Sequence, residues 1–255
     1  MLSKLRHSRP VGILRYHAYR DVLLAWPRRH GCNICGWRGR HFLTYEHTHI
    51  LCPRCGSMVR HRLLAAALGL PAVAARLRLD GTVLHLSPEY CLGLVFGPRA
   101  GRYIRADWAT STCDVRQDAT QLAFVSSSID VVIACDMLEH IPDDRGVLSE
   151  IHRVLRRGGT AILSVPQSDD AQGTFEEASI RTPAERARAY GQADHVRNYG
   201  ADFGDRVAEA GFAVTCVDQS AFDPATVARH VLRPPVPFQE PWGWNHRRVY
   251  FAERR

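Results

Sequence analysis

The hydrophobic positions of the central chain fall into short runs separated by segments of helical periodicity. Four of these runs are apolar and rich in β-branched residues, and they predict strands at residues 82–86, 103–106, 131–134 and 160–165. Strands that alternate with helices in this way form parallel sheets whose two faces are both covered. The predicted fold class is therefore α/β, with a doubly wound and mostly parallel sheet.

Helices are predicted before and between these strands. One spans residues 59–70, a short second one spans 71–79, and a crossover helix spans 147–155. The pair Gly158-Gly159 follows the crossover helix, and it predicts a left-handed stop at the helix end.

The two ends of the chain carry weaker patterns. Residues 1–30 form a basic segment with partial helical spacing, and we expect it to pack on a neighbouring element. Residues 213–217 and 248–252 predict an antiparallel hairpin at the edge of the sheet, joined by a long Pro-rich loop.

Composition fits one α/β domain with a small accessory module. The chain has 255 residues, of which 45% are hydrophobic and 23% are charged. Its apolar runs are much shorter than the roughly 18 residues of a membrane span. The N-terminus lacks the apolar run of a secretory signal, so we expect a cytoplasmic protein without a membrane partner.

Positive charge is concentrated in the N-terminal third. Residues 1–80 contain 14 Lys and Arg against 3 Asp and Glu, whereas residues 81–255 contain 19 against 23. Such asymmetry can indicate a nucleic-acid contact. However, almost every cation is Arg, and the base composition of the genome also explains this preference for Arg over Lys.

Two Cys-x-x-Cys pairs predict a metal module over residues 31–62. Each pair places two thiolates on a tight turn that is followed by Gly, and 16 residues separate the pairs. Such knuckles close a tetrahedral site, which predicts structural zinc; redox dithiols are the alternative. The expected ligands are Cys32, Cys35, Cys52 and Cys55.

His41, His47 and His49 lie between the pairs and could replace a ligand, but surface or packing roles fit them better. The other cysteines, Cys91, Cys113, Cys135 and Cys216, are expected to be small buried hydrophobic residues.

Several central segments match one family in the right order. They are residues 83–89, Asp107, residues 118–124, residues 129–141 and residues 154–166. Residues 82–212 thereby resemble the class I S-adenosylmethionine-dependent methyltransferases of the type 11 subgroup. The second knuckle with residues 56–62 is similar to a preface found in bacterial relatives. The resemblance implies a Rossmann-like, seven-stranded sheet over residues 63–255 and S-adenosylmethionine as cofactor.

Two aspartates suit the adenosyl part of that cofactor. Asp107 ends a predicted strand, about 22 residues beyond His85, and a carboxylate at this place can accept the ribose hydroxyls. Asp118, with Leu122 and Phe124 nearby, offers an acceptor for the adenine amine. Either aspartate could instead only cap a following helix.

The first turn departs from the family pattern. The family has several glycines there, but Ser87 to Cys91 contains none, and the first Gly is Gly93. We expect Glu89 to pair with the methionine ammonium of the cofactor; a degenerate domain that no longer binds cofactor is the competing interpretation. The resemblance places the cofactor contacts at His85, Ser87, Glu89, Asp107, Asp118, Ala119, Cys135 and Asp136.

Methyl transfer needs alignment of donor and acceptor, and a base is optional. The candidate bases are His140, after the fourth strand, and His195, which has Asp194, Arg197 and Tyr199 close in sequence. For His140, bracing the loop is the alternative role. The polar stretch 167–194 is expected to form a lid or acceptor wall.

Three functions remain open at this point. The leading prediction is methylation of a small-molecule acceptor, for example in secondary metabolism. The second is an RNA methyltransferase whose basic zinc module holds the phosphate backbone, with Arg54, Arg60, His61 and Arg62 as contacts. The third is a zinc-stabilised interaction protein on a degenerate cofactor fold. Steep salt dependence would favour RNA, and calorimetry with S-adenosylmethionine would separate the third from both others.

Overall fold

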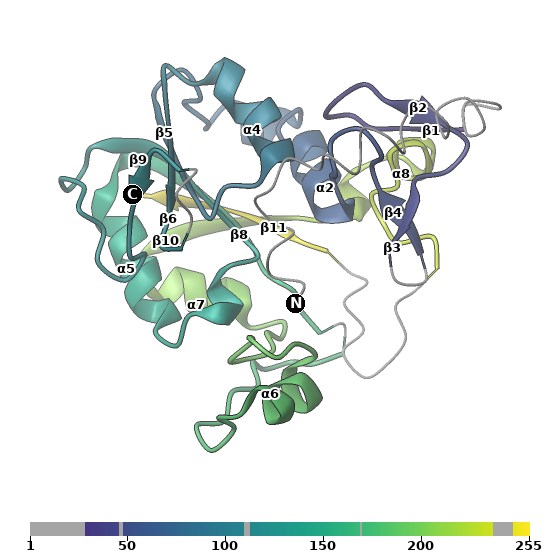
Figure 1. Cartoon of the computed structure of the whole chain (residues 1–255). Helices are drawn as coiled ribbons and strands as arrows, with labels where there is room; N and C mark the ends of the chain where they lie inside the picture. The colour runs from purple at the N-terminus through teal and green to yellow at the C-terminus, as the bar shows by residue number, and fades with distance from the viewer. Residues whose placement is uncertain (1–28, 46–47, 110–112, 169, 237–246) are drawn as a thin grey trace.

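The computed structural model describes residues 29–45, 48–109, 113–168, 170–236 and 247–255 (Figure 1). The helical pattern predicted for residues 1–30 lies almost wholly outside these ranges, and so does His47.

A seven-stranded sheet forms the centre of the molecule. Adjacent strands of the sheet pair in parallel, except that β11 runs antiparallel to the strands on both of its sides. This confirms the seven-stranded, mostly parallel sheet. In spatial order the strands are β10 (Phe212–Val217), β11 (Val249–Arg254), β9 (Leu155–Ser164), β8 (Ile129–Cys135), β5 (Thr82–Leu86), β6 (Arg102–Asp107) and β7 (Val115–Arg116).

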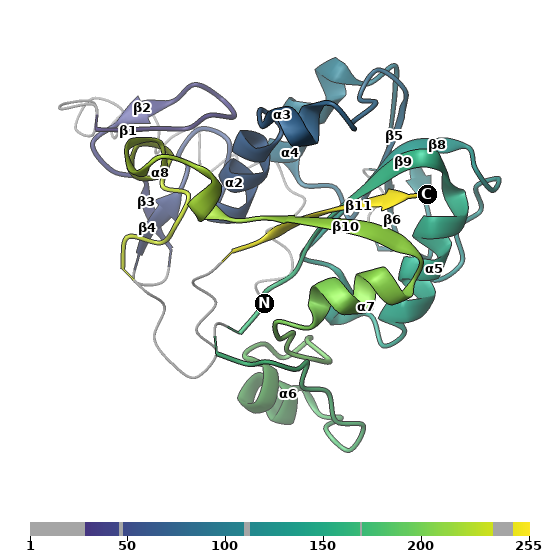
Figure 2. The same cartoon turned by 180° about the vertical axis from the view of Figure 1, so that it is seen from behind.

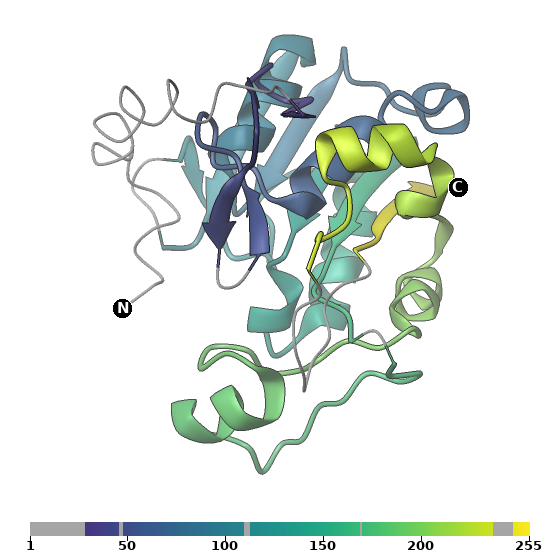
Figure 3. The same cartoon turned by 90° about the vertical axis from the view of Figure 1, so that its right-hand side faces the viewer.

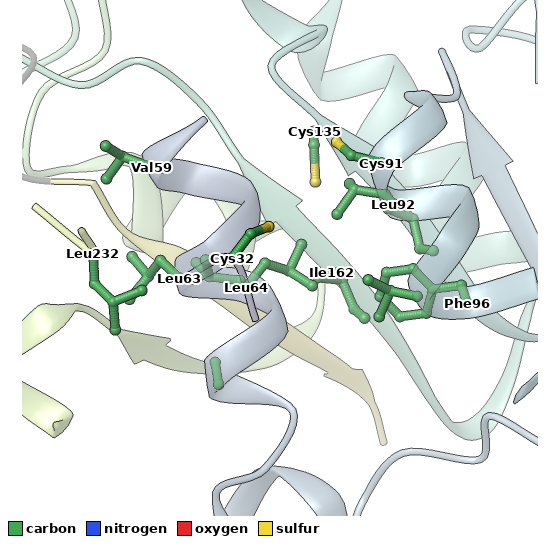
Figure 4. Packing of buried hydrophobic residues seen from close by; sticks show 14 of the residues in the cluster. Cys32, Val59, Leu63, Leu64, Cys91, Leu92, Phe96, Cys135, Ile162 and Leu232 are labelled. Atoms are coloured by element: carbon green, nitrogen blue, oxygen red, sulfur yellow. The ribbon is translucent and has the colours of Figure 1, made fainter. Parts of the chain in front are cut away.

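Helices cover both faces of the sheet (Figures 1 and 2). The helices α2 (Val59–Ala67) and α4 (Tyr90–Phe96) bury their apolar residues against one face, together with alternate residues of β8 and β9. Figure 4 shows this packing around Leu63, Leu64 and Ile162. On the other face, α5 (Asp144–Val154) and α7 (Phe203–Glu209) form a second buried cluster. All seven residues of β8 are buried, because helices cover this central strand on both sides.

The remaining elements are short. They are α3 (Pro71–Ala74), α6 (Pro183–Tyr190), α8 (Pro224–His230), the 3₁₀ turns η2 (Gly97–Arg99), η3 (Leu138–His140) and η4 (Gln219–Ala221), and the strands β1 (His30–Gly31), β2 (Arg38–Gly39), β3 (Leu43–Tyr45) and β4 (Thr48–Leu51). No helix among the described residues is long and apolar enough to cross a membrane.

The structure corrects two details of the predicted architecture. Helix α5 ends at Val154 and β9 begins at Leu155, so the Gly158-Gly159 pair lies inside β9 and does not stop the helix. Gly158 does adopt the left-handed conformation, with φ +74°, beside a register shift between β8 and β9. The C-terminal hairpin forms, but only β10 is at the edge, because β11 inserts between β10 and β9.

Candidate functional site

The two cysteine pairs come together as two knuckles of the same geometry. In each knuckle the Gly amide, Gly36 or Gly56, donates to the carbonyl of the first Cys, and both glycines have positive φ. The sulfur of Cys32 is 3.7 Å from that of Cys55, and the sulfur of Cys35 is 3.6 Å from that of Cys52. Thiolates about 2.3 Å from a tetrahedral zinc lie about 3.8 Å apart, so the donor set and spacing fit zinc.

Arg62 fastens this cysteine centre to the rest of the protein. Its fully buried guanidinium donates to the carbonyls of Ile50 and Ser57 beside the knuckles, and to those of His230 and Val231 at the end of α8. Burial lowers its pKa to about 10, yet it stays charged at neutral pH. The side chain expected to contact an anionic partner therefore points into the molecule.

The residues that directly follow strands β5 and β8 have strained backbone conformations. Ser87 and Asp136 each follow directly after one of these neighbouring strands, and both have positive φ, at 48° and 45°. Non-glycine residues are seldom left-handed, and such strain is concentrated at functional sites. Ser87 also donates its hydroxyl to Asp107, over 3.0 Å, from the end of β5 to the end of β6. Three predicted cofactor residues thus meet at the carboxyl edge, where open α/β sheets bind ligands.

A buried ion network lies at the same edge. Arg60, from α2, contacts Glu89 and Asp136 at 2.9 Å each, and Arg247 lies 3.6 Å from Asp136. His61 contacts the same Glu89 oxygen at 2.7 Å. The network joins the helix that follows the cysteine centre to the ends of β5 and β8.

Both carboxylates of this network are held in the charged form. Burial alone would raise their pKa values, but His61 and Arg60 hold the pKa of Glu89 well below its usual value. Arg60 and Arg247 likewise lower the pKa of Asp136 against the effect of burial. Glu89 Oε2 is buried and has no hydrogen-bond partner among the described residues.

Two further predicted cofactor residues, His85 and Cys135, lie inside the fold. His85 is fully buried in β5 and hydrogen-bonds the Tyr103 hydroxyl over 2.6 Å, and burial lowers its pKa to about 4. Cys135 and Cys91 belong to the buried cluster in Figure 4, and burial raises the pKa of both thiols. Cys113 is half-buried and Cys216 is exposed, so the prediction that the four unpaired cysteines are buried was wrong for these two.

Asp118 lies in the loop after β7, next to the end of β6. The amide of Gln117 donates to the Asp107 carbonyl, which brings the two aspartates to adjacent strand ends. The exposed Asp118 side chain accepts bonds from the amide and hydroxyl of Thr120, at 2.9 and 2.7 Å, and these bonds lower its pKa. Ala119 beside it is buried. These contacts close a local turn and cap no helix, because the described residues between Asp118 and β8 contain none; the adenine role stays a prediction.

The candidate bases His140 and His195 meet each other. Their rings pack edge to face with centroids 4.8 Å apart. Glu139 joins them, with its Oε1 3.7 Å from His140 Nε2. His195 is buried, and burial, together with the neighbouring His140, lowers its pKa to about 4, so it is neutral at pH 7.

Arg197 holds the two histidine loops together. It donates to the carbonyls of Leu138, Ile141 and Pro142 over 2.6 to 2.8 Å, and the amide of Val196 donates to Glu139. The stretch 167–194, expected as a lid, contains α6 (Pro183–Tyr190), which lies below the sheet in the view of Figure 1, and the same segment is seen from the side in Figure 3; the lid role stays a prediction.

Sequence reasoning missed three charged residues of this edge: Arg60, Arg247 and Glu139. The sequence predicts Arg60 only as a contact for an anionic partner, because it comes just after the second zinc knuckle. A useful signal was its place on α2, three to four positions from apolar residues that pack on the sheet. Glu139 directly precedes a candidate histidine, and that adjacency was a signal of shared function.

Comparison with known proteins supports a methyltransferase. Residues 98–163 match a family described as "Methyltransferase domain". An uncharacterized methyltransferase of Mycobacterium sp. (strain KMS) is 38% identical over 85 residues, covering 33% of this chain and 27% of that protein. Another, from Mycobacterium avium (strain 104), is 28% identical over 195 residues, covering 74% and 71%.

A solved S-adenosylmethionine-dependent methyltransferase from Mesorhizobium loti is 18% identical, with a TM-score of 0.45, over 72% of this chain and 96% of that one. The chain spans about a quarter of the length of the mycobacterial relative with 38% identity. The sequence match over residues 98–163, set in a seven-stranded and mostly parallel sheet, supports a class I methyltransferase.

Proposed function

We propose that the protein transfers a methyl group from S-adenosylmethionine to a small-molecule acceptor, for example in secondary metabolism. The observation that carries the proposal is the convergence of Ser87, Asp107 and Asp136 at the carboxyl ends of three neighbouring strands, two of which, β6 and β8, lie within the methyltransferase sequence match. Ligands of open α/β sheets bind at this edge. The bound cofactor would supply an electrophilic methyl group on a sulfonium.

The ion network suits the methionine end of the cofactor, which carries one ammonium and one carboxylate. Glu89 Oε2 would accept from the ammonium, while Arg60 and Arg247 would offer cations to the carboxylate. These side chains would bind the methionine end of the cofactor in place of the glycine-rich turn, which the loop after β5 lacks. Asp107 would bind the ribose hydroxyls, and Asp118 with Ala119 would border the adenine.

The acceptor would lie beside His140 and His195. His140 follows β8, the strand that matches the fourth strand of the family. Because transfer from a sulfonium is an in-line displacement, the main task of the chain is to align the two reactants and exclude water. If the acceptor must lose a proton and no metal ion engages these histidines, His140 or His195 would be the base that takes it.

We further propose that the cysteine centre holds a structural zinc ion. Four thiolates occupy all four coordination positions of a tetrahedral zinc ion, so no position is left for substrate. The buried contacts of Arg62 connect this centre with α8, which supports a bracing role. The proposed place of the protein is the cytoplasm.

Calorimetric titration with S-adenosylmethionine tests the cofactor part. We expect Glu89→Ala to weaken binding about tenfold to hundredfold, the loss typical of one hydrogen bond to a charged group. Ser220→Ala, at an exposed position outside the site, serves as control. Unchanged affinity in Glu89→Ala would remove the ammonium role, and no binding by the wild-type protein would favour the non-catalytic interaction protein.

One observation favours RNA as an alternative acceptor. Arg29, Arg38 and Arg229 line a hollow of about 530 Å³ between the cysteine module and α8. Against it, Arg60, His61 and Arg62 face the protein interior. RNA binding should weaken steeply as salt rises, whereas binding of a small neutral acceptor should barely change.

A further inference from the structure

We propose that Glu139, His140 and His195 bind one divalent transition-metal ion at the carboxyl edge of the sheet. One ligand atom from each residue lies within 4.8 Å of the other two. Glu139 and His140 stand in η3, directly after β8, and His195 returns to them from the far end of the α6 segment. This centre is separate from the four cysteines.

The outer contacts of the histidines match those of metal ligands. A ligating histidine usually donates its second ring nitrogen to a carboxylate or a backbone carbonyl, which fixes the ring. His140 Nδ1 lies 3.3 Å from the carbonyl of Asp194 and 3.4 Å from its carboxylate, so Nε2 is the nitrogen directed at Glu139. His195 is hydrogen-bonded to the backbone of Tyr190.

The surrounding contacts hold the three ligands in place before any ion binds. Arg197 ties the His195 loop to three carbonyls of the η3 loop, and the amide of Val196 donates to a fourth, the backbone carbonyl of Glu139. Arg197 is held in turn by Glu176 at 2.7 Å. A metal site needs such support, because small errors in ligand position cost affinity.

The donor set indicates the class of ion. Two imidazoles and one carboxylate suit Zn²⁺, Fe²⁺, Co²⁺ or Ni²⁺, and they leave coordination positions for other ligands. His140 has 21% of its side chain exposed, which gives an approach from solvent.

An open position indicates an acceptor with a hydroxyl oxygen that can ligate the ion; this step rests on the proposed methyl transfer. The ion would polarise that oxygen and lower the pKa of its proton. The oxygen–carbon bond forms as the sulfur–carbon bond breaks, the products are the methyl ether and S-adenosylhomocysteine, and the hydroxyl proton leaves to solvent.

Titration with Co²⁺ of protein that carries one equivalent of zinc per chain, with excess metal removed by gel filtration, tests the site without S-adenosylmethionine. We expect one further equivalent of Co²⁺ to bind, without the thiolate charge-transfer band that entry into the cysteine centre would produce. Glu139→Gln and His195→Gln should weaken this binding by at least about tenfold. Asp194→Asn, whose carboxylate is 60% exposed, should weaken it about tenfold to hundredfold through His140 and should leave the fold intact.

His49→Gln is the matched control, because His49 stacks on His41 at an exposed place in the cysteine module. Its Co²⁺ affinity should equal that of the wild type. The proposal is overturned if the wild type binds no Co²⁺ beyond the cysteine centre, or if the loss follows His49→Gln. The Co²⁺ titration does not depend on methyl transfer, so a failure here leaves the proposed function standing. A failure of the proposed function would remove the hydroxyl acceptor but leave the metal site.

Discussion

His85 links the stability of the fold to pH. Its pKa in the folded protein is about 4, because burial disfavours the charged ring, while the ordinary value is about 6.5. The unfolded chain therefore takes up a proton below about pH 6.5, and the folded protein does so only near pH 4. The stabilisation is present above about pH 6.5 and is lost as pH falls.

We expect His85→Gln to reduce the loss of stability between pH 7 and pH 5 by about 2 kcal/mol. Urea unfolding of the variant and the wild type at both pH values measures this difference. Ser220→Ala, at an exposed position without a titratable side chain, should keep the wild-type pH dependence. Equal acid sensitivity in His85→Gln and wild type would show that this ring does not titrate as described.

Arg60 is the cation shared by two buried carboxylates. Replacement by Met leaves Glu89 and Asp136 without it, and removal of one partner of a buried ion pair costs about 3–5 kcal/mol. We expect Arg60→Met to lose about this much in the free energy of unfolding, and Arg60→Lys to lose less. Arg78→Met, an exposed control, should change stability by under about 0.5 kcal/mol. A loss as small as that of the control would contradict the network.

At the scale of elements, the central strands were predictable from the sequence, whereas the short strands of the cysteine module were not. The strands β5 and β8 are buried on both faces, so their apolar runs are visible in the sequence alone. The strands β1 to β4 are two to four residues long and have no such run. The spacing of Arg60 from the apolar residues of α2 indicates a position facing the sheet, but its carboxylate partners Glu89 and Asp136 come from distant segments that no local pattern brings together.

Metal removal should act first on the elements around the cysteine centre. Cys32, Cys52 and Cys55 share a buried cluster with Val59 and Leu63 of α2, so the thiolates are part of the packing. A strong chelator should therefore abolish amide-exchange protection in β1–β4 and the first turn of α2, while β8 and β9 stay protected.

Cys216→Ser, at an exposed cysteine, should behave as the wild type in this exchange experiment. Because Arg60 follows the second knuckle, the same treatment should lower the affinity for S-adenosylmethionine. Protection that survives complete removal of metal would contradict a zinc-dependent module.

At the scale of the whole molecule, the fold brings distant segments to one edge of the sheet. Asp107 and Ser87 could be assigned to that edge from the sequence, because each follows a recognisable strand. Arg247 could not, since it precedes the last strand and reaches Asp136 only through the insertion of β11 beside β9. The residues proposed to contact the cofactor, Ser87 and Asp107, were thus more predictable from the sequence than the buried arginine Arg247 beside them.

The central claim is that S-adenosylmethionine binds at the carboxyl ends of β5, β6 and β8. Its most direct test is calorimetric titration of wild type, Asp107→Ala and Asp223→Ala, the last at an exposed cap of α8. We expect one bound cofactor per chain for wild type and Asp223→Ala, and an affinity about tenfold to hundredfold lower for Asp107→Ala. Equal affinity in all three proteins would contradict it.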